Sequence, residues 1–342
     1  MKKTDQIQDC YVGIDVSKLT LDVSVITATG YQDYHQFENN NSGFKTLFKW
    51  LKDKNFFTVE RCLFCLEHTG LYTRQLISEL LQKQCKVWME SALHLKRSMG
   101  MTRGKTDKVD SYRIARYAMT NNDRAVLVKL SGTTLQKLKD LLSNRERLSK
   151  AYQSIRISIQ ELKLVDLSMG KELEKLNSTA LKGLLTCKKK VEGRMEELIN
   201  QDEELKRLYS LISSVKCVGK VLATELLIYT NAFTRMENVR QLACYCGVAP
   251  FEHSSGTSVR GRTGTSNFAN MHLKSTLHMA AISALRYVPD IKQYYERKVT
   301  EGKHKMTVIN SIRNKLIKRV MAVVKRGTPY QENYSKINLE LS

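Results

Sequence analysis

The chain has 342 residues, 42% of them hydrophobic, and its 56 Lys and Arg residues outnumber its 34 Asp and Glu residues to give a formal charge of +22. The hydrophobic content is that of a globular protein with about two domains, and the charge predicts a polyanionic partner, nucleic acid before an anionic membrane surface. The sequence has no run of eighteen apolar residues, and residues 1–6 lack an apolar signal core, so we expect a cytoplasmic protein that is neither secreted nor membrane-spanning.

The eight cysteines are scattered along the chain. In a reducing compartment we expect small buried side chains rather than disulfides. Cys62 and Cys65 have the spacing of a zinc knuckle, but the sequence offers no second Cys or His pair at a suitable distance. We therefore predict that both are buried thiols.

Residues 10–27 predict a β-hairpin whose first strand ends at Val16 and whose turn covers residues 17–20. Asp15 lies near the end of the first strand, which its apolar composition predicts to be buried on both faces. Asp22 alternates with apolar residues in the second strand. We therefore expect Asp22 to face solvent and to take no part in a site.

The next elements alternate between helix and strand. The pattern predicts a helix over residues 42–51 with Ser42 at its start, a strand over residues 62–67, a helix over residues 71–81 and a strand over residues 86–89. This order is typical of an α/β sheet. Open sheets of this kind bind ligands at the carboxyl ends of their strands, which is where Asp15 and Glu67 lie.

Asp107 and Asp110 lie three residues apart at the start of a predicted helix that continues through residue 118. They share one face of that helix, and the helix dipole favours negative charge there, so both carboxylates can reach a single hard cation. Together with Asp15 and Glu67 they predict a divalent-metal site for phosphodiester chemistry.

A basic, glycine-punctuated stretch, residues 95–105, precedes this carboxylate pair. It cannot form a stable strand, and we expect a mobile loop in which Arg103 and Lys105 contact a phosphate backbone beside the metal site. A solvated loop without a partner is the alternative.

The middle of the chain, residues 133–215, has no proline and follows a helical pattern throughout. Its apolar residues step by threes, fours and sevens, which predicts two long antiparallel helices with a heptad-like seam and a break near residues 166–170. The seam comprises Leu138, Leu141, Leu148, Tyr152, Ile155, Ile159 and Leu162. The exposed bases, residues 188–190 among them, predict a solvated face, with contact to nucleic acid or a second protomer as the alternative.

Residues 212–227 predict a helix, a glycine-containing turn and a second helix, which can present backbone N–H groups to a DNA phosphate. Further helices are predicted over residues 239–246 and 270–285. The last of these carries a buried stripe of Leu273, Leu277, Ala280, Ala281 and Ala284. We interpret His272 and His278 on the same helix as packing or surface residues.

The polar residues 251–268 combine small hydroxyl side chains, three glycines and two arginines, without an apolar pattern. A hydroxyl on a glycine-flanked turn beside Arg260 and Arg262 has what a serine nucleophile needs to attack phosphorus. An ordinary surface loop is the alternative. Ser254 and Ser255 are both candidates, and the glycine that follows favours Ser255.

These motifs together resemble the IS110-family transposases, including the Piv-type DNA invertases, over nearly the full length of the chain. The motifs are residues 13–18, 66–70 and 105–111, and Ser255 with Gly256, Arg260, Gly261 and Leu273. The resemblance implies a RuvC-like (RNase H-type) first domain with an Asp-Glu-Asp-Asp tetrad that binds Mg²⁺, with Mn²⁺ as a substitute. It places the tetrad on Asp15, Glu67, Asp107 and Asp110 and the nucleophile on Ser255. Thr265 and Ala269 stand where the family usually has isoleucine and glycine.

The same resemblance implies a DNA recombinase that excises and inserts its own element, guided by a structured non-coding bridge RNA that pairs with donor and target DNA. A protein that holds one RNA and two duplexes needs a large positive charge. The resemblance also implies a homo-oligomer, a dimer or tetramer, in which the carboxylate site of one subunit works with the serine of another, and a nucleoid-associated location in a bacterium.

We therefore expect an α/β RuvC-like domain over residues 8–130, a helical coiled-coil linker over residues 131–211, and a mainly helical C-terminal domain with a helix-hairpin-helix-like element over residues 212–330. One alternative is a Mg²⁺-dependent RuvC-like junction or RNase H-type nuclease, in which the carboxylates activate water and the serine loop only binds DNA. A basic nucleic-acid-binding protein without enzymatic activity is the other.

Overall fold

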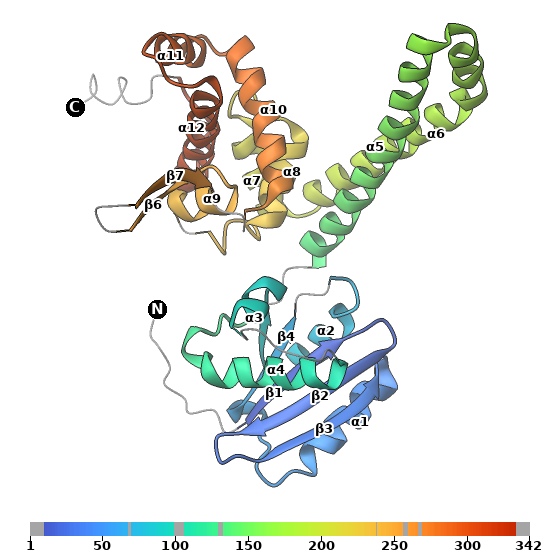
Figure 1. Ribbon diagram of the computed structural model, residues 1–342, viewed down its shortest axis with the longest axis vertical. Helices are drawn as coiled ribbons and strands as arrows, with labels where there is room; N and C mark the ends of the chain where they lie inside the picture. Colours follow the sequence, from blue (N-terminus) through green and yellow to red (C-terminus); the bar gives the residue numbers. More distant parts are fainter. Residues whose placement is uncertain are drawn as a thin grey trace. The chain divides into compact units, whose positions relative to one another are not determined.

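The computed structural model describes residues 10–67, 70–98, 106–128, 133–236, 238–255, 259–265 and 269–332, and their side chains except at residues 97, 133, 252–255 and 259–263. The chain forms two compact units, Met1–Leu130 and Ser131–Ser342 (Figure 1). The first unit mixes strands and helices and the second is mostly helical, which confirms the predicted fold class at this level.

The first unit is built on a five-stranded sheet in the order β3-β2-β1-β4-β5. Its strands are β1 (Cys10–Val16), β2 (Thr20–Thr27), β3 (Gln32–Glu38), β4 (Cys62–Glu67) and β5 (Lys86–Glu90). The hairpin, β4 and β5 confirm the predicted elements; β3, which pairs antiparallel with β2, is a further strand at the sheet edge. Its residues are mostly polar and Phe37 is its one buried residue, so it carries no apolar alternation to predict it.

Helices cover both faces of this sheet (Figure 1). On one face α1 (Asn41–Lys52) and α2 (Arg74–Gln82) pack against Ile14 and Phe64. On the other, α3 (Ala92–Ser98) and α4 (Asp107–Thr120) pack against Tyr11 and Cys65. Alternate residues of β1 and β4 therefore point into two separate hydrophobic cores, which is why these strands consist of continuous apolar runs.

Three predicted boundaries in this unit are wrong. Helix α2 begins at Arg74 rather than at residue 71. Asn40 rather than Ser42 caps α1, because the Asn40 side-chain oxygen accepts a hydrogen bond of 2.9 Å from the backbone N–H of Gly43. The stretch predicted as a loop from residue 95 is helical as far as Ser98. The rest of that stretch, with Arg103 and Lys105, lies outside the described residues.

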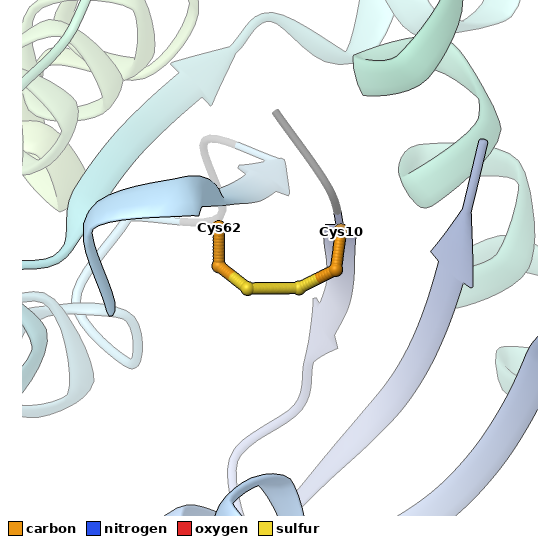
Figure 2. Close-up of a disulfide and its surroundings, with 2 residues drawn as sticks. All are labelled: Cys10 and Cys62. Carbon is orange, nitrogen blue, oxygen red and sulfur yellow. A yellow bond between two sulfur atoms is a disulfide. The ribbon is translucent and has the colours of Figure 1, made fainter. Parts of the chain in front are cut away.

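Cys10 and Cys62 form a disulfide (Figure 2). The prediction that all eight cysteines are thiols is therefore wrong for this pair. The two residues are 52 positions apart in sequence, but the parallel register of β1 and β4 sets them opposite each other with their Cα atoms 4.8 Å apart, a separation that a disulfide can span. Cys65 is a buried free thiol, as predicted.

The second unit begins with two long helices, α5 (Thr133–Val165) and α6 (Leu167–Asn200), drawn in green in Figure 1. A single residue, Asp166, separates them and caps α6, its carboxylate accepting a hydrogen bond of 3.0 Å from the backbone N–H of Met169. The seven predicted seam residues are all buried or half-buried. The antiparallel pair and its break are therefore confirmed.

The remainder of the second unit is a helical bundle with a short hairpin. Its elements are α7 (Glu203–Ser213), α8 (Lys220–Tyr229), α9 (Val239–Tyr245), β6 (Pro250–Ser255), β7 (Val259–Thr265), α10 (Met271–Tyr287), α11 (Pro289–Thr300) and α12 (Lys305–Arg326). The predicted helix, turn and helix correspond to α7, the segment that ends at Gly219, and α8. The polar stretch without an apolar pattern contains β7 and most of β6, because strands held by backbone pairing need no apolar period.

One hydrophobic core joins the base of the long helical pair to this bundle. It brings together Leu138 of α5, Ile199 of α6, Ala281 of α10 and Leu316 of α12. The buried stripe predicted on α10 is confirmed at all five positions. Within the described residues, no helix combines the length and the apolar composition needed to cross a membrane.

Candidate active site

The carboxyl end of β1 brings two carboxylates together. Asp15 and Asp22 are direct partners in the antiparallel register of β1 and β2. Asp22 is only 2% exposed and accepts hydrogen bonds from the Tyr34 hydroxyl at 2.6 Å and from Nε2 of Gln36 at 3.2 Å. The prediction that Asp22 faces solvent is therefore wrong, because cross-strand partners share one face of the sheet and β3 supplies donors for this one.

Helix α4 lies close against this part of the sheet. A Cβ atom at Gly13 would come within 2.2 Å of the backbone nitrogen of Ala115, so a glycine is needed for the helix to approach β1. The hydroxyls of Ser24 and Ser111 lie 2.8 Å apart across the same interface, where both residues are buried. Strands β1 and β2 and helix α4 are thereby held in fixed register.

The first turn of α4 carries Asp107 and Asp110, as predicted. Thr106 caps the helix by accepting a hydrogen bond of 3.3 Å from the backbone N–H of Val109. The helix dipole favours both carboxylates at this end. Nη1 of Arg113 donates to Oδ1 of Asp110 at 2.9 Å and so holds that side chain in place.

The other three predicted carboxylates all influence the pKa of Asp15. The pKa of Asp15 is raised to about 6, first by burial and then by the negative charges of Asp107, Asp110, Glu67 and Asp22. The parallel register of β1 and β4 runs through Ile14 and Leu66, so Asp15 and Glu67 come next on adjacent strands. Residues from two strands and one helix therefore form a single concentration of negative charge.

These residues fit a divalent cation. Carboxylate oxygens are the ligands that hard cations such as Mg²⁺ and Mn²⁺ prefer, and the raised pKa of Asp15 shows charge that its neighbours leave uncompensated. No three of the four have ligating oxygens within 4.8 Å of one another in the part of the chain that the structure describes. A cation bound among these residues would have to draw their side chains closer together.

A further acidic residue, not among the four predicted from the sequence, lies on the neighbouring strand. Glu90 ends β5 and pairs with Glu67 of β4 in the parallel register. Its carboxylate lies 2.8 Å from Nδ1 of His94 and accepts a hydrogen bond of 3.2 Å from the Tyr117 hydroxyl. The rule that located Glu67, an acid at the carboxyl end of an apolar strand, also identifies Glu90.

The second unit contains the predicted serine. Ser255 is the last residue of β6, and its Cα pairs with that of Val259 in β7, while Ser254 pairs with Arg260. Arg262 follows within β7. The backbone positions of these residues are described, and the roles assigned to them stay predictions.

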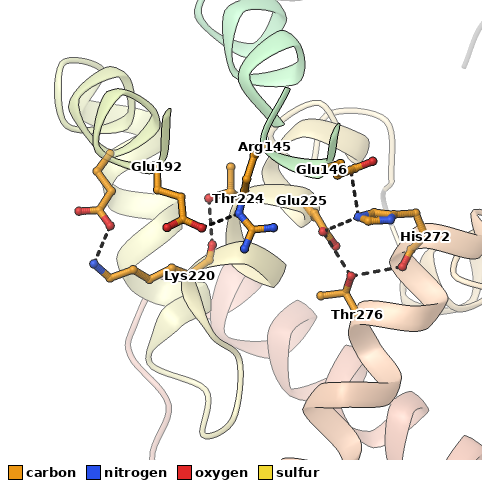
Figure 3. A network of polar contacts seen from close by, with 9 residues as sticks. Arg145, Glu146, Glu192, Lys220, Thr224, Glu225, His272 and Thr276 are labelled. Atoms are coloured by element: carbon orange, nitrogen blue, oxygen red, sulfur yellow. Dashed lines mark hydrogen bonds and ion pairs between the residues drawn. The ribbon is translucent and has the colours of Figure 1, made fainter. Parts of the chain in front are cut away.

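His272, interpreted above as a packing or surface residue, lies between two carboxylates in the second unit. Its Nε2 is 3.0 Å from Glu146 and 2.9 Å from Glu225 (Figure 3). Burial raises the pKa of Glu225, an effect that the nearby His272 opposes. The three residues are more than 40 positions apart in sequence, so no local spacing pointed to them.

Family models match both halves of the chain. A model of the DEDD transposases of IS110, described as "Transposase", matches residues 12–164, and one described as "Transposase IS116/IS110/IS902 family" matches residues 209–296. The first match contains all four predicted carboxylates and the second contains Ser255. A DEDD transposase fold suggests the use of a divalent metal.

Individual relatives extend the likeness along the chain. The pilin gene-inverting proteins of Moraxella lacunata and Moraxella bovis are each 28% identical over 327 residues, which cover 94% of this chain and 98% of theirs. The uncharacterized 43.6 kDa protein of insertion element IS110 from Streptomyces coelicolor (strain ATCC BAA-471 / A3(2) / M145) is 28% identical over 152 residues, 44% of this chain and 37% of its own. With both models of one transposase family matched in order and relatives similar from end to end, this chain belongs to the IS110 family of transposases and is a DNA-recombining enzyme.

Proposed function

We propose that this transposase excises and inserts its own element at specific sites through a covalent phosphoserine link to DNA. Ser255 is the nucleophile, and Asp15, Glu67, Asp107 and Asp110 are the metal ligands. The proposed metal site is supported above all by the raised pKa of Asp15, because the other three carboxylates are all among the causes of that shift.

A RuvC-like first unit is the structural part of this proposal. The supporting features are an antiparallel β1–β2–β3 meander, parallel strands β4 and β5 beside it, and a helix that brings two acids to the carboxyl end of β1. Each of the three parallel strands carries an acid at or next to its last residue, which fits the rule that ligands bind at such edges.

The chemistry is phosphoryl transfer. The Ser255 Oγ–phosphorus bond forms as the bond between phosphorus and a deoxyribose oxygen breaks, and the serine proton ends on the departing oxygen. Mg²⁺, or Mn²⁺ in its place, supplies charge neutralisation at the scissile phosphate when bound by the four carboxylates. Arg260 and Arg262 are proposed to bind the phosphate, since guanidinium groups contact its oxygens in pairs. Arg103 and Lys105 are proposed to contact the DNA or RNA backbone.

The proposed partners are donor and target DNA and a structured non-coding bridge RNA that pairs with both. The net charge of +22 supports the binding of several nucleic-acid strands at once. The name of the Moraxella relatives describes inversion of a gene, which also requires DNA to be cut and rejoined, so a strand-transfer role agrees with that name. We place the protein on chromosomal DNA in a bacterial cytoplasm.

We also propose a homo-oligomer, a dimer or tetramer, that combines the carboxylates of one subunit with the serine of another. Exposed apolar side chains at the tip of the long helical pair support a contact between protomers at that tip. Leu164 and Val165 are 88% and 89% exposed, and Leu167 and Met169 are exposed beside them. Adjacent apolar side chains at the end of a helical arm are typical of an association surface.

The decisive experiment incubates the full-length protein with its native flanking DNA, denatures the mixture and looks for DNA attached covalently to protein. We expect an adduct with the wild type and with Ser254→Ala, and none with Ser255→Ala. Metal-dependent cleavage that persists in Ser255→Ala, with no adduct from any variant, would make the protein a RuvC-like nuclease in which the carboxylates activate water.

Asp107→Asn tests the metal site independently. Loss of one ligand removes charge stabilisation of the transition state, and we expect cleavage to slow at least about 100-fold, or about 2.7 kcal/mol in the barrier. Unchanged cleavage by Asp107→Asn would remove the carboxylates from the mechanism.

A further inference from the structure

A second group of potential metal ligands lies in the second unit, separate from the four carboxylates. Glu146 comes from α5, Glu225 from α8 and His272 from α10. One ligand atom from each residue lies within 4.8 Å of the other two. Figure 3 shows the two carboxylates approaching the His272 ring from different helices.

The distances within this group are close to those of a coordination shell. Nε2 of His272 lies 2.9 Å from Oε1 of Glu225 and 3.0 Å from Oε1 of Glu146. Ligands about 2.0–2.2 Å from a common tetrahedral ion lie about 3.3–3.6 Å apart. The three side chains therefore need to separate by only about 0.5 Å to bind one ion.

Hydrogen bonds within the protein do not satisfy all the polar atoms of these three residues. Nε2 of an imidazole carries at most one hydrogen, yet two carboxylate oxygens contact it. The Thr276 hydroxyl donates to Oε1 of Glu225 at 3.2 Å, while Oε2 of Glu225 is buried and has no hydrogen-bond partner among the described residues. The Glu225 side chain is 0% exposed, and a buried carboxylate with an unpaired oxygen is costly.

We propose that Glu146, Glu225 and His272 bind a divalent transition-metal ion of the Zn²⁺ class. One imidazole nitrogen and two carboxylates suit Zn²⁺, because imidazole favours it over Mg²⁺. His272 is 39% exposed and Glu146 is 24% exposed, so the ion has a route of entry and water completes its coordination. When Glu225 binds the ion through both carboxylate oxygens, its unpaired Oε2 also gains a partner.

The ion has a structural role in this proposal. Glu146 belongs to the long arm that α5 and α6 form, whereas Glu225 and His272 belong to the bundle. A shared ion cross-links these three helices at the base of the arm. It thereby fixes the direction in which the arm leaves the bundle, and it does so with ligands distinct from the all-carboxylate site of the first unit.

The test measures Zn²⁺ binding by the full-length chain carrying Asp107→Asn and Asp110→Asn, which remove ligands of the carboxylate site. After chelator treatment and titration, we expect about one tightly bound Zn²⁺ per chain and a raised melting temperature. Adding Glu146→Gln or His272→Gln should weaken binding at least about tenfold, the effect known for loss of even an outer partner. Glu146→Gln replaces a partly exposed side chain and so keeps the test valid if Glu225→Gln fails to fold.

The matched control is Glu192→Gln. Glu192 of α6 pairs with Nε of Arg145 at 2.6 Å, one residue from Glu146, and is outside the ligand group. We expect it to leave Zn²⁺ affinity unchanged. Absence of tight Zn²⁺ binding, or equal binding by Glu146→Gln, His272→Gln and the parent chain, would overturn the proposal.

Cobalt substitution identifies the ligands directly. Co²⁺ bound by imidazole and carboxylate shows visible d–d bands without the strong thiolate band that cysteine ligation produces. We expect the d–d bands to disappear in His272→Gln. A thiolate band that is insensitive to His272→Gln would place the ion on cysteines instead, and the assignment would be wrong.

Discussion

Asp15 of β1 lies directly across from Asp22 of β2, and the Tyr34 hydroxyl donates to Asp22 at 2.6 Å. Two carboxylates on neighbouring strands repel each other, so the donors on β3 determine whether the arrangement is stable. Burial and the bond to Asp22 raise the pKa of Tyr34 to about 12, which keeps its proton in place over the physiological pH range.

Tyr34→Phe removes this donor while keeping the ring. We expect a loss of about 1–2 kcal/mol in the free energy of unfolding, because a buried carboxylate loses a partner, measured by urea denaturation. Tyr31→Phe is the matched control, since the Tyr31 hydroxyl contacts Asp33 at 3.3 Å in an exposed position, and it should cost less than about 0.5 kcal/mol. Equal effects of the two substitutions would contradict a special role for Tyr34.

Gly13→Ala should prevent the normal packing of α4. The added Cβ would lie 2.2 Å from the backbone nitrogen of Ala115 and 2.3 Å from the Ser111 carbonyl oxygen, so the helix must move away from β1. We expect a destabilisation of about 1–3 kcal/mol and weaker Mg²⁺ binding, measured by denaturation and calorimetry. Gly183→Ala in α6, where an added Cβ meets nothing within 4 Å, should stabilise the chain by about 0.5–1 kcal/mol.

Lowering the pH should reduce the free energy of unfolding of the second unit, because His278 becomes protonated. Nη2 of Arg313 lies 2.6 Å from Nδ1 of His278, which suits the neutral ring, and burial followed by the charge of Arg313 lowers the pKa of His278 below its usual 6.5. The unfolded chain therefore binds this proton more readily than the folded one. This contribution to stability is complete above about pH 6.5 and is lost as the pH falls below it.

His278→Gln tests that dependence. Glutamine offers Arg313 an acceptor that does not titrate, so the fall in melting temperature between about pH 6.5 and 5 should become shallower than in the wild type. His304→Gln is the control, because the His304 side chain caps the start of α12 at the surface. Identical pH profiles for the wild type and His278→Gln would rule out this pair as the source.

Charges at the tip of the helical arm should abolish self-association if that tip is the protomer contact. Leu164→Asp with Val165→Asp replaces two exposed apolar side chains, each worth about 1.5–3 kcal/mol when buried. We expect the mass measured by light scattering to fall towards that of the monomer. Met306→Asp changes an exposed apolar residue of α12 and should leave the mass unchanged. An oligomer that survives the double substitution would place the contact elsewhere.

Local patterns were sufficient to predict much of the first unit. Strands β1 and β4 are apolar runs with an acid at or next to their last residue, and α4 begins with two acids on one face. Asp15, Glu67, Asp107 and Asp110 were therefore recognisable without coordinates. The helical period was equally informative for the long antiparallel pair, because its seam residues are all buried or half-buried.

Polar strands and partners distant in sequence were not predictable in this way. Strand β3 and the β6–β7 hairpin are held by backbone pairing, which leaves little trace in side-chain pattern. The alternation around Asp22 correctly predicts a strand, but whether Asp22 is buried or exposed depends on the packing of α4 and on β3. The Cys10–Cys62 pair depends in turn on a parallel register between two strands.

The sequence by itself determined which residues carry the chemistry: four acids at element ends, a serine beside glycine and arginine, and a strongly basic chain. Only the tertiary structure decided which of these charges interact. Electrostatic coupling acts over a few ångströms in space, whatever the separation along the chain. The rise in the pKa of Asp15 and the meeting of Glu146, Glu225 and His272 therefore exist only once the helices and strands are packed.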